Sequence, residues 1–326
     1  MRSEIWVMES ALPWQAAVLA ADIERMGFDG MVLTDSQNLA GECFVALAVA
    51  AVSTSTLRLG TGVANAMTRH PATLASAIAS LNAVSGGRAV LGIGRGSSSL
   101  ASVGLAPAPL VEFEIALDVL QRYLRGEDVA FASLPARWRT QDASTVLADG
   151  PGASRLRFLG DLPGLAKVPL DVAATGPRAI MLAARHAERV TFAVGTAPDR
   201  VRWALGLARD SRHRAGQPAD LAAGAFVNIV IDDDIDRARS IGSGRLASTV
   251  RLNAAHDTAV ATTTNGGPDV ADRFGIFGPA SSCVERLQEL TELGLTRFVV
   301  IPPGPAADPE GTTLRRIADT VLPALG

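Results

Sequence analysis

The sequence predicts an α/β protein that folds as one (β/α)8 TIM barrel over residues 1–326, with an insertion after the fourth helix. Short apolar segments alternate with helical segments along most of the chain, which is typical of βαβ units and a parallel sheet. We count eight such strands, each followed by a helix, and 326 residues suit one large barrel. A doubly wound sheet is the alternative, but eight regular units without an extra domain favour closure.

The first four predicted strands are short apolar segments that end in glycine or small polar residues. Pro13 and Pro71 stand in the first turn of the helices that they open, where the missing N–H has no helical partner in any case. Residues 126–167 are rich in Pro, Gly and Arg and break the rhythm, which predicts an excursion across one face. The strands are 4–8, 28–33, 57–63 and 89–93, and the helices are 13–26, 41–52, 71–84 and 110–124.

The alternation of predicted strands and helices returns after residue 167. Asp232, Asp233, Asp234 and Asp236 are interpreted as the acidic start of a helix rather than as a metal site, because carboxylates stabilise helix N-termini. Residues 252–276 include DTAVATTTNGGP, which is low in charge and rich in turn residues, and predict a mobile loop. The strands of this half are 168–173, 189–194, 222–231 and 297–301, and the helices are 177–187, 198–215, 281–293 and 311–325.

Composition and charge exclude several classes of protein. Hydrophobic residues make up 48% of the chain and charged residues 19%, which supports a large core. The net charge of −3 gives no basic surface for nucleic acid. The chain has no apolar run of about 18 residues and no signal-peptide pattern, so we expect no membrane contact and a cytoplasmic location. Cys43 and Cys283 lie far apart, so a disulfide is not expected.

The stretch from Ser85 to Ser99, SGGRAVLGIGRGSSS, organises the predicted site. A buried strand runs into Gly94-Arg95-Gly96 and three serines. The glycines let the backbone turn sharply and approach a ligand, and the N–H and hydroxyl groups suit an anionic or polar cofactor. A dinucleotide fingerprint fails because Ser97 stands where the third glycine is needed, and the Gly-Lys-Ser/Thr end of a P-loop is absent.

The other strand ends complete this predicted site, because barrels bind ligands at the C-terminal ends of their strands. Thr175-Gly176 before a helix suits a phosphate, although a plain helix start is an equal interpretation. Together the strand ends are poor in acids and bases, which favours the cradle of a large planar cofactor over a hydrolytic site or a metal site. These ends carry Thr34, Asp35 and Ser36, then Gly62, Val63, Ala64 and Asn65, then Gly94 to Ser98, and finally Thr175, Gly176 and Pro177.

With these residues located, the chain resembles the luciferase-like superfamily of flavin- and deazaflavin-dependent oxidoreductases. Within it, the chain is most similar to the methylenetetrahydromethanopterin reductase-like group. The resemblance implies a (β/α)8 barrel with an insertion, and a homodimer formed through early helices such as 41–52 and 72–83. It is carried by GFDGMVLTDS (27–36), LRLGTGVAN (57–65), TRHPATLASAIASLNAVSGGRAVLGIGRGSSS (68–99), AATGPRAIMLAARHAERV (173–190) and GPASSCVERLQELTELGLTRFVV (278–300).

The resemblance also implies roles for individual residues. A non-prolyl cis peptide at Gly62-Val63 would support the cofactor ring, and Asp35 would be the catalytic acid. Ser36 stands where several relatives have a histidine, and Ser97 where relatives acting on sugar phosphates or alcohols carry an acid. Both departures favour an acceptor that is already activated. The implied cofactor-binding residues are Ser36, Gly62, Val63, Asn65, Gly94, Arg95, Gly96, Ser97, Thr175, Gly176 and Pro177.

The sequence therefore predicts an oxidoreductase that moves a hydride between coenzyme F420 and a small iminium or conjugated acceptor. Arg69, Arg95 and Arg178 are candidates for contacts with the acidic tail of F420. One alternative is an FMN-dependent monooxygenase that takes reduced flavin from a partner reductase. Another is a barrel that binds flavin or a ligand without turnover. The substrate is not predicted, because residues 126–167 and 252–276, which we expect to shape its pocket, carry no motif.

Overall fold

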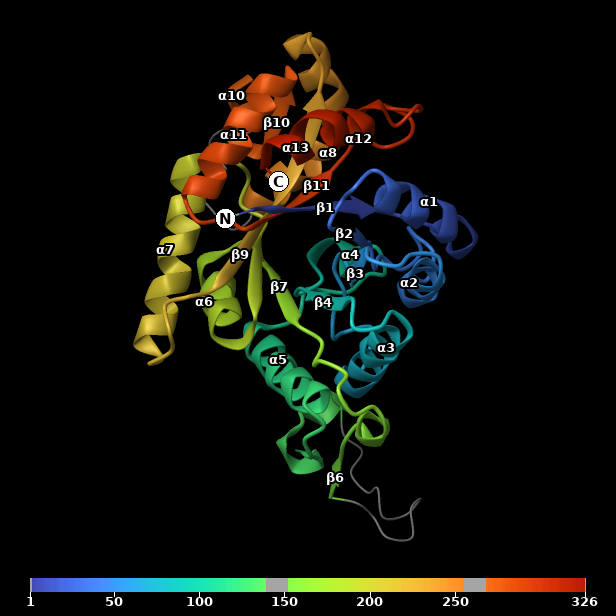
Figure 1. Ribbon diagram of the computed structural model, residues 1–326. Coiled ribbons are helices and arrows are strands. Elements are labelled where there is room, and N and C mark those ends of the chain that lie inside the picture. Colours follow the sequence, from blue (N-terminus) through green and yellow to red (C-terminus); the bar gives the residue numbers. More distant parts are fainter. Residues whose placement is uncertain (1, 139–151, 255–267, 326) are drawn as a thin grey trace.

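Eight parallel strands form a closed barrel in the computed structural model, which describes residues 2–138, 152–254 and 268–325. Around the barrel the strands pair in the order β1, β2, β3, β4, β7, β8, β9 and β11. β11 pairs with β1 and closes the ring (Figure 1). The predicted barrel is confirmed, and the doubly wound alternative is wrong. The barrel strands are β1 (Glu4–Glu9), β2 (Gly30–Leu33), β3 (Arg58–Thr61), β4 (Ala89–Ile93), β7 (Leu170–Ala174), β8 (Arg189–Phe192), β9 (Ala222–Ile231) and β11 (Arg297–Ile301).

Helices surround the strands, and five of the described helices begin with a proline, as at Pro13 and Pro71. The predicted final helix over 311–325 is interrupted by a π-helical turn at Ile317–Val321. Pro323 follows this turn, and it has no N–H to donate to the carbonyl four residues earlier. None of the described helices is long and apolar enough to cross a membrane. The helices are α1 (Pro13–Arg25), α2 (Cys43–Val52), α3 (Pro71–Val84), α5 (Leu110–Leu124), α6 (Pro177–His186), α7 (Pro198–Arg214), α11 (Ala280–Glu292), α12 (Thr312–Arg316) and α13 (Leu322–Leu325).

The segment after β9 differs most from expectation. α8 (Ile235–Ala254) is followed, after the undescribed residues 255–267, by α10 (Pro268–Phe274) and β10 (Gly275–Gly278). The prediction of a loop over 252–276 is therefore wrong at both of its ends. β10 is a ninth strand that pairs only with the second half of β9, outside the barrel. The sequence signal was weak, since two apolar residues between two glycines make a strand only where a partner strand is available.

The acidic run is a helix start, as predicted. The Asp234 carboxylate accepts hydrogen bonds from the N–H groups of Asp236 and Arg237, at 3.0 and 3.1 Å. Asp232 forms an ion pair with the Arg237 side chain. Two of these carboxylates therefore serve the first turn of α8.

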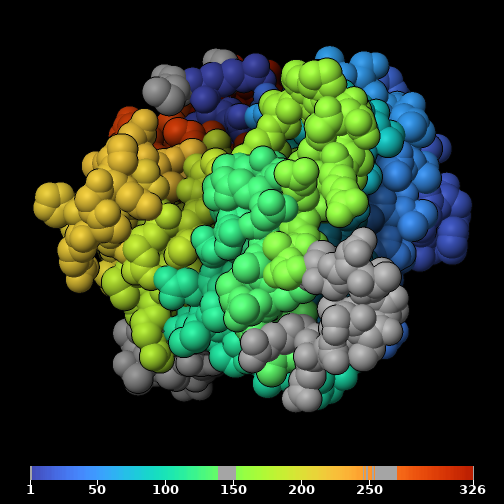
Figure 2. Space-filling view, turned by 90° about the horizontal axis from the view of Figure 1, so that it is seen from below, coloured from blue at the N-terminus to red at the C-terminus, as the bar shows by residue number. Residues whose placement is uncertain are grey.

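The insertion lies against the outside of α3 and α5. A small antiparallel pair, β5 (Val129–Ala130) and β6 (Ala153–Ser154), joins short 3-10 turns. Tyr123 of α5 contacts Ser154 at 2.8 Å, and Asn82 of α3 donates to the carbonyl of Ala166 at 2.8 Å. Figure 2 shows the green and lime segments running side by side across this face. The described residues of 126–167 lie on this face, and residues 139–151 lie outside the described residues.

A polar and aromatic layer fills the N-terminal half of the barrel. Trp6 is fully buried, and Gly30 beside it has no room for a Cβ, which would lie 2.5 Å from the indole ring. The Arg297 guanidinium lies 4.0 Å from the centre of that ring and binds Glu4 and Asp171, at 2.6 and 3.1 Å. Burial raises the pKa of the Asp171 carboxyl, although Arg297 opposes this effect. This layer confines the main cavity to the C-terminal end of the barrel.

Candidate cofactor and substrate site

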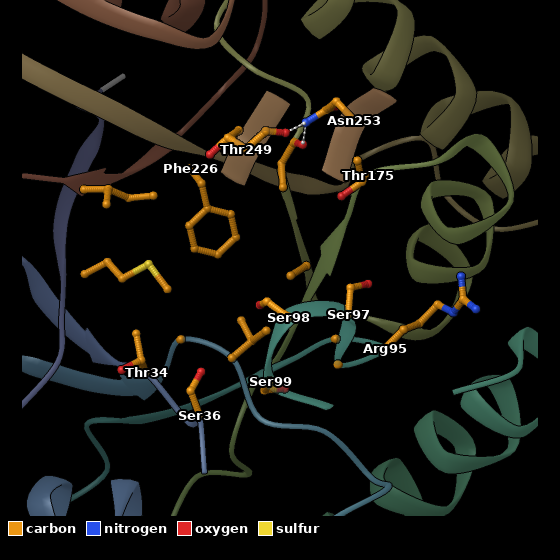
Figure 3. A pocket seen from close by; sticks show the side chains of 18 of the residues that line it. Thr34, Ser36, Arg95, Ser97, Ser98, Ser99, Thr175, Phe226, Thr249 and Asn253 are labelled. Atoms are coloured by element: carbon orange, nitrogen blue, oxygen red, sulfur yellow. Dashed lines mark hydrogen bonds between the residues drawn. The ribbon is translucent and has the colours of Figure 1, made fainter. Parts of the chain in front are cut away.

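A cavity of about 270 Å³ opens at the C-terminal ends of the barrel strands (Figure 3). Most of the predicted site residues meet there, although they come from four different strand ends. The glycine-rich stretch after β4 supplies one wall, and the turn after β3 supplies a second. The predicted residues that line it are Ser36, Gly62, Val63, Gly94, Arg95, Gly96, Ser97 and Thr175.

A second cavity, also of about 270 Å³, adjoins the first and shares Arg95, Ser97 and Thr175 with it. Gly176 and Pro177 line this second cavity, together with Arg178 at the start of α6. Burial and the neighbouring Arg178 charge both lower the pKa of Arg95. Two guanidinium groups and a helix N-terminus therefore face one polar space, which favours an anion.

The serines after β4 form a short helix, α4 (Ser97–Ala101), rather than the predicted loop. Gly96 precedes it with φ of 81°, a conformation that side chains rarely adopt, and a Cβ there would lie 2.7 Å from Leu100. The Arg95 Nε donates to the carbonyl of Ala108 at 2.7 Å, and the N–H of Ala108 donates back to the Arg95 carbonyl at 3.0 Å. These contacts fix Arg95 between the two cavities.

The Gly62–Val63 peptide bond is cis, as the resemblance implies. Neighbouring backbone groups hold it in place: Gly62 donates to Leu33 of β2 at 2.7 Å, and Ala64 donates to Gly92 of β4 at 2.9 Å. Val63 lines the cavity at this point. The turn after β3 thus offers a fixed apolar support on one side of the site.

Asp35 lies beside the cavity but does not line it. Its side chain is buried, accepts a hydrogen bond from Gln37 at 2.7 Å and lies 3.6 Å from the Arg69 Nε. Burial raises the pKa of Asp35, and the Arg69 charge opposes the rise. Arg69 also pairs with Glu42, so it is engaged by two carboxylates and does not line either cavity. The catalytic role of Asp35 stays a prediction, and the residue that its strand end presents to the cavity is Ser36.

Asn65 is also absent from the cavity wall. It is fully buried, and its Oδ1 accepts the N–H groups of Met67 and Thr68, each at 3.0 Å. Its Nδ2 reaches the Ser99 hydroxyl at 3.4 Å. Asn65 therefore supports the turn after β3 and α4, and its predicted cofactor contact stays a prediction.

The wall formed by β9 and α8 was missed in the sequence. Phe226 and Asn228 alternate with outward residues along β9, so a reading of this strand end at period two would have found them. Thr249 and Asn253 lie one turn apart on α8, which is far in sequence from the end of any barrel strand. The Asn253 Nδ2 donates to the carbonyls of Thr249 and Ala193, at 2.9 and 3.1 Å, which ties α8 to the barrel (Figure 3). No described residue of 126–167 lines this cavity, and residues 139–151 lie outside the described residues, so that part of the pocket prediction stays a prediction.

The lining suits a planar, polar ligand. Met8, Val63, Phe226 and Ile301 supply apolar surface, and serine and threonine hydroxyls supply hydrogen bonds. Arg95 is the one charged residue among the described residues that line the main cavity. The described part of this wall is suited to binding and orienting a ligand.

Comparisons with known proteins agree with this geometry. The family model of luciferase-like monooxygenases matches residues 9–297. The chain is 28% identical over 305 residues to a 5,10-methylenetetrahydromethanopterin reductase of Methanolobus tindarius, covering 86% of this chain and 87% of that one. It is 30% identical over 320 residues to an F420-dependent glucose-6-phosphate dehydrogenase of Beutenbergia cavernae, covering 93% and 90%.

A solved structure shares the fold. The coenzyme F420 dependent tetrahydromethanopterin reductase from Methanopyrus kandleri superimposes with a TM-score of 0.76 at 22% identity, over 100% of this chain and 99% of that one. The family match spans most of the chain and includes the cavity walls from the end of β2 to α8. The chain therefore belongs to the luciferase-like monooxygenase family of oxidoreductases.

Proposed function

We propose that this oxidoreductase transfers a hydride between coenzyme F420 and a small organic acceptor that is an iminium or a conjugated double bond. The observation that carries the proposal is the pair of adjoining cavities, one apolar and rich in hydroxyls, the other facing Arg95 and Arg178. Two similar proteins named above are F420-dependent, which supports the choice of cofactor.

The chemistry of the wall fits this cofactor. The apolar surface at Val63 suits a planar ring, and the second cavity suits a phosphate, held by Thr175, the start of α6 and the two arginines. When bound, the reduced coenzyme would supply a hydride, that is, a hydrogen with two electrons, to an electrophilic carbon of the acceptor. The residues of this chain would bind both partners, orient them and exclude water.

The residues of the wall also favour an activated acceptor. An iminium becomes a neutral amine when its carbon gains a hydride, so it needs no added proton. A conjugated double bond needs one proton on its second carbon, and the Ser36 hydroxyl at the end of β2 can pass one from water. The described lining residues include no carboxylate and no histidine. An alcohol oxidation, which needs a base for the hydroxyl proton, fits this wall less well.

The second candidate is an FMN-dependent monooxygenase supplied with reduced flavin by a partner reductase. The family description, luciferase-like monooxygenase, favours it. FMN also carries a planar ring and a phosphate, so the two cavities fit it in outline. The paired arginines can hold the phosphate of either cofactor, and what favours F420 is that two of the similar proteins are F420-dependent.

A titration distinguishes these candidates. The purified protein is titrated with oxidised F420 and, separately, with FMN, and quenching of cofactor fluorescence is followed. Micromolar binding of F420 with weaker binding of FMN supports the proposal. The reverse preference supports the monooxygenase, for which oxygen consumption is then measured. Binding of neither cofactor would refute both candidates.

A further inference from the structure

The strand order places β9 directly across the barrel from β3. Four pairings separate them in one direction, through β4, β7 and β8, and four in the other, through β2, β1 and β11. The turn after β3 carries Val63, and the end of β9 carries Phe226 and Asn228, all at the same cavity. A flat ring that rests on the β3 turn therefore has β9 on its other side.

Asn228 offers a hydrogen-bond acceptor at this opposite wall. The residue is 5% exposed, and its Nδ2 lies 3.4 Å from both the Thr249 hydroxyl and the Phe274 carbonyl. Because the carbonyl can only accept, the amide turns its nitrogen to that side and its Oδ1 away from it. Within the described residues, Oδ1 receives no hydrogen bond. Oδ1 is open to the cavity, so a ligand that brings an N–H or O–H group to it gains a hydrogen bond.

Asn253 is a different case, although it lines the same wall. The Asn253 Oδ1 has no hydrogen-bond partner among the described residues, and the surrounding protein buries it completely. The Asn228 Oδ1 is not completely buried. A ligand in the cavity therefore reaches Asn228 and not Asn253. The role of Asn253 is to tie α8 to Ala193 at the end of β8.

The wall around Asn228 carries no charge among the described residues. Its neighbours in the cavity are Phe226, Thr249 and Ile301. Arg95, the one charged residue among the described lining residues, also lines the second cavity. Figure 3 shows Phe226 and Thr249 across the cavity from Ser99. The β9 side thus combines an aromatic ring with a neutral amide.

We propose that Phe226 and Asn228 form the substrate side of the cavity, and that the substrate is an uncharged, flat molecule whose N–H or O–H group donates to Asn228 Oδ1. This inference rests on the proposed function, because it assumes that the cofactor ring occupies the β3 side. It names Asn228 as a specificity-determining residue and excludes phosphorylated molecules as preferred substrates.

Two probes of nearly equal shape test the inference. 5,6-Dihydropyridin-2(1H)-one is an uncharged conjugated lactam with one N–H, and 5,6-dihydro-2H-pyran-2-one is the lactone that has an oxygen in its place. Their dissociation constants are measured by calorimetry on the F420-loaded protein, for the wild type and for Asn228→Leu, which keeps the side-chain volume. We expect the wild type to prefer the lactam, and the variant to lower the lactam-over-lactone ratio about tenfold.

The lactam-over-lactone ratio of the variant is compared with that of the wild type, so any difference in affinity between the two probes that does not depend on Asn228 cancels. Gln288→Leu is the matched control: it makes the same change from an amide to an alkyl side chain on the exposed side of α11, away from both cavities, and is expected to keep the ratio. Asn228→Ala, which removes the acceptor and leaves a small side chain, repeats the test if the leucine variant is unstable.

The outcomes separate this inference from the proposed function. An unchanged ratio in both Asn228 variants, or binding of neither probe to the wild type, would overturn the inference. A parallel loss of F420 affinity in Asn228→Leu would also overturn it, because Asn228 would then contact the cofactor. Failure of the wild type to bind F420 at all refutes the proposed function, and this is measured before any probe is added.

Discussion

Replacing Arg95 by glutamine is expected to weaken F420 binding through the loss of one charged contact to the acidic tail. Arg95 lies between the two cavities, and its Nε is already engaged by the Ala108 carbonyl, so the terminal nitrogens remain for an anion. Its charge is partly buried next to Arg178, and an anion between the two relieves their repulsion. A hydrogen bond to a charged group contributes about 1.5–3 kcal/mol. The expected loss in affinity is therefore about 10- to 150-fold.

The assay compares two ligands with the same ring. Fluorescence titrations are made with F420 and with its riboflavin-like precursor, which has the deazaflavin ring but no phosphate and no acidic tail. Arg95→Gln should weaken F420 and leave the precursor within about twofold. Arg202→Gln, on the exposed side of α7, removes the same charge away from both cavities and is the control. Equal losses for both ligands, or no loss for F420, would refute the assignment of the tail to this cavity.

Three further predictions concern assembly and stability. We propose a homodimer through the first helices, where Trp14 is 75% exposed; Trp14→Glu should yield a monomer in light scattering, and a monomeric wild type would contradict this. Burial by itself would raise the pKa of Glu24, but hydrogen bonds from three backbone N–H groups lower it to about 2 from 4.5. The Glu24 carboxylate therefore stabilises the folded protein above pH 4.5, and this stabilisation is lost as the pH falls towards 2. Glu24→Gln should therefore lose about 1 kcal/mol in urea unfolding at neutral pH and much less near pH 3, whereas a pH-independent difference would count against the contact. Arg297→Met leaves the Asp171 carboxylate buried without its cation and should cost about 3–5 kcal/mol, part of which Asp171→Asn should restore; a loss under about 1 kcal/mol in the same assay would rule out this pairing.

Much of the fold follows from local patterns. Strand and helix periods, prolines in first turns and glycines at strand ends all act over a few residues, and they were enough to predict the barrel, its eight strands and the stretch after β4. The elements that were missed depend on distant partners. β10 forms because β9 extends beyond β8 and offers a free edge, and α4 forms because Gly96 adopts a left-handed conformation against Leu100.

For the site, the sequence by itself determined which strand ends carry glycines and hydroxyls, and the family resemblance implied the cis peptide at Gly62–Val63. Only the tertiary structure decided which side chains meet. Asp35 turns towards Arg69 of the next strand–helix connection rather than into the cavity, since a buried carboxyl is stabilised beside a cation. Asn228 and Val63 line the same cavity because closure of the barrel brings together strands that are more than a hundred residues apart in sequence. The spacing of apolar residues within one strand or helix cannot predict such contacts across the barrel.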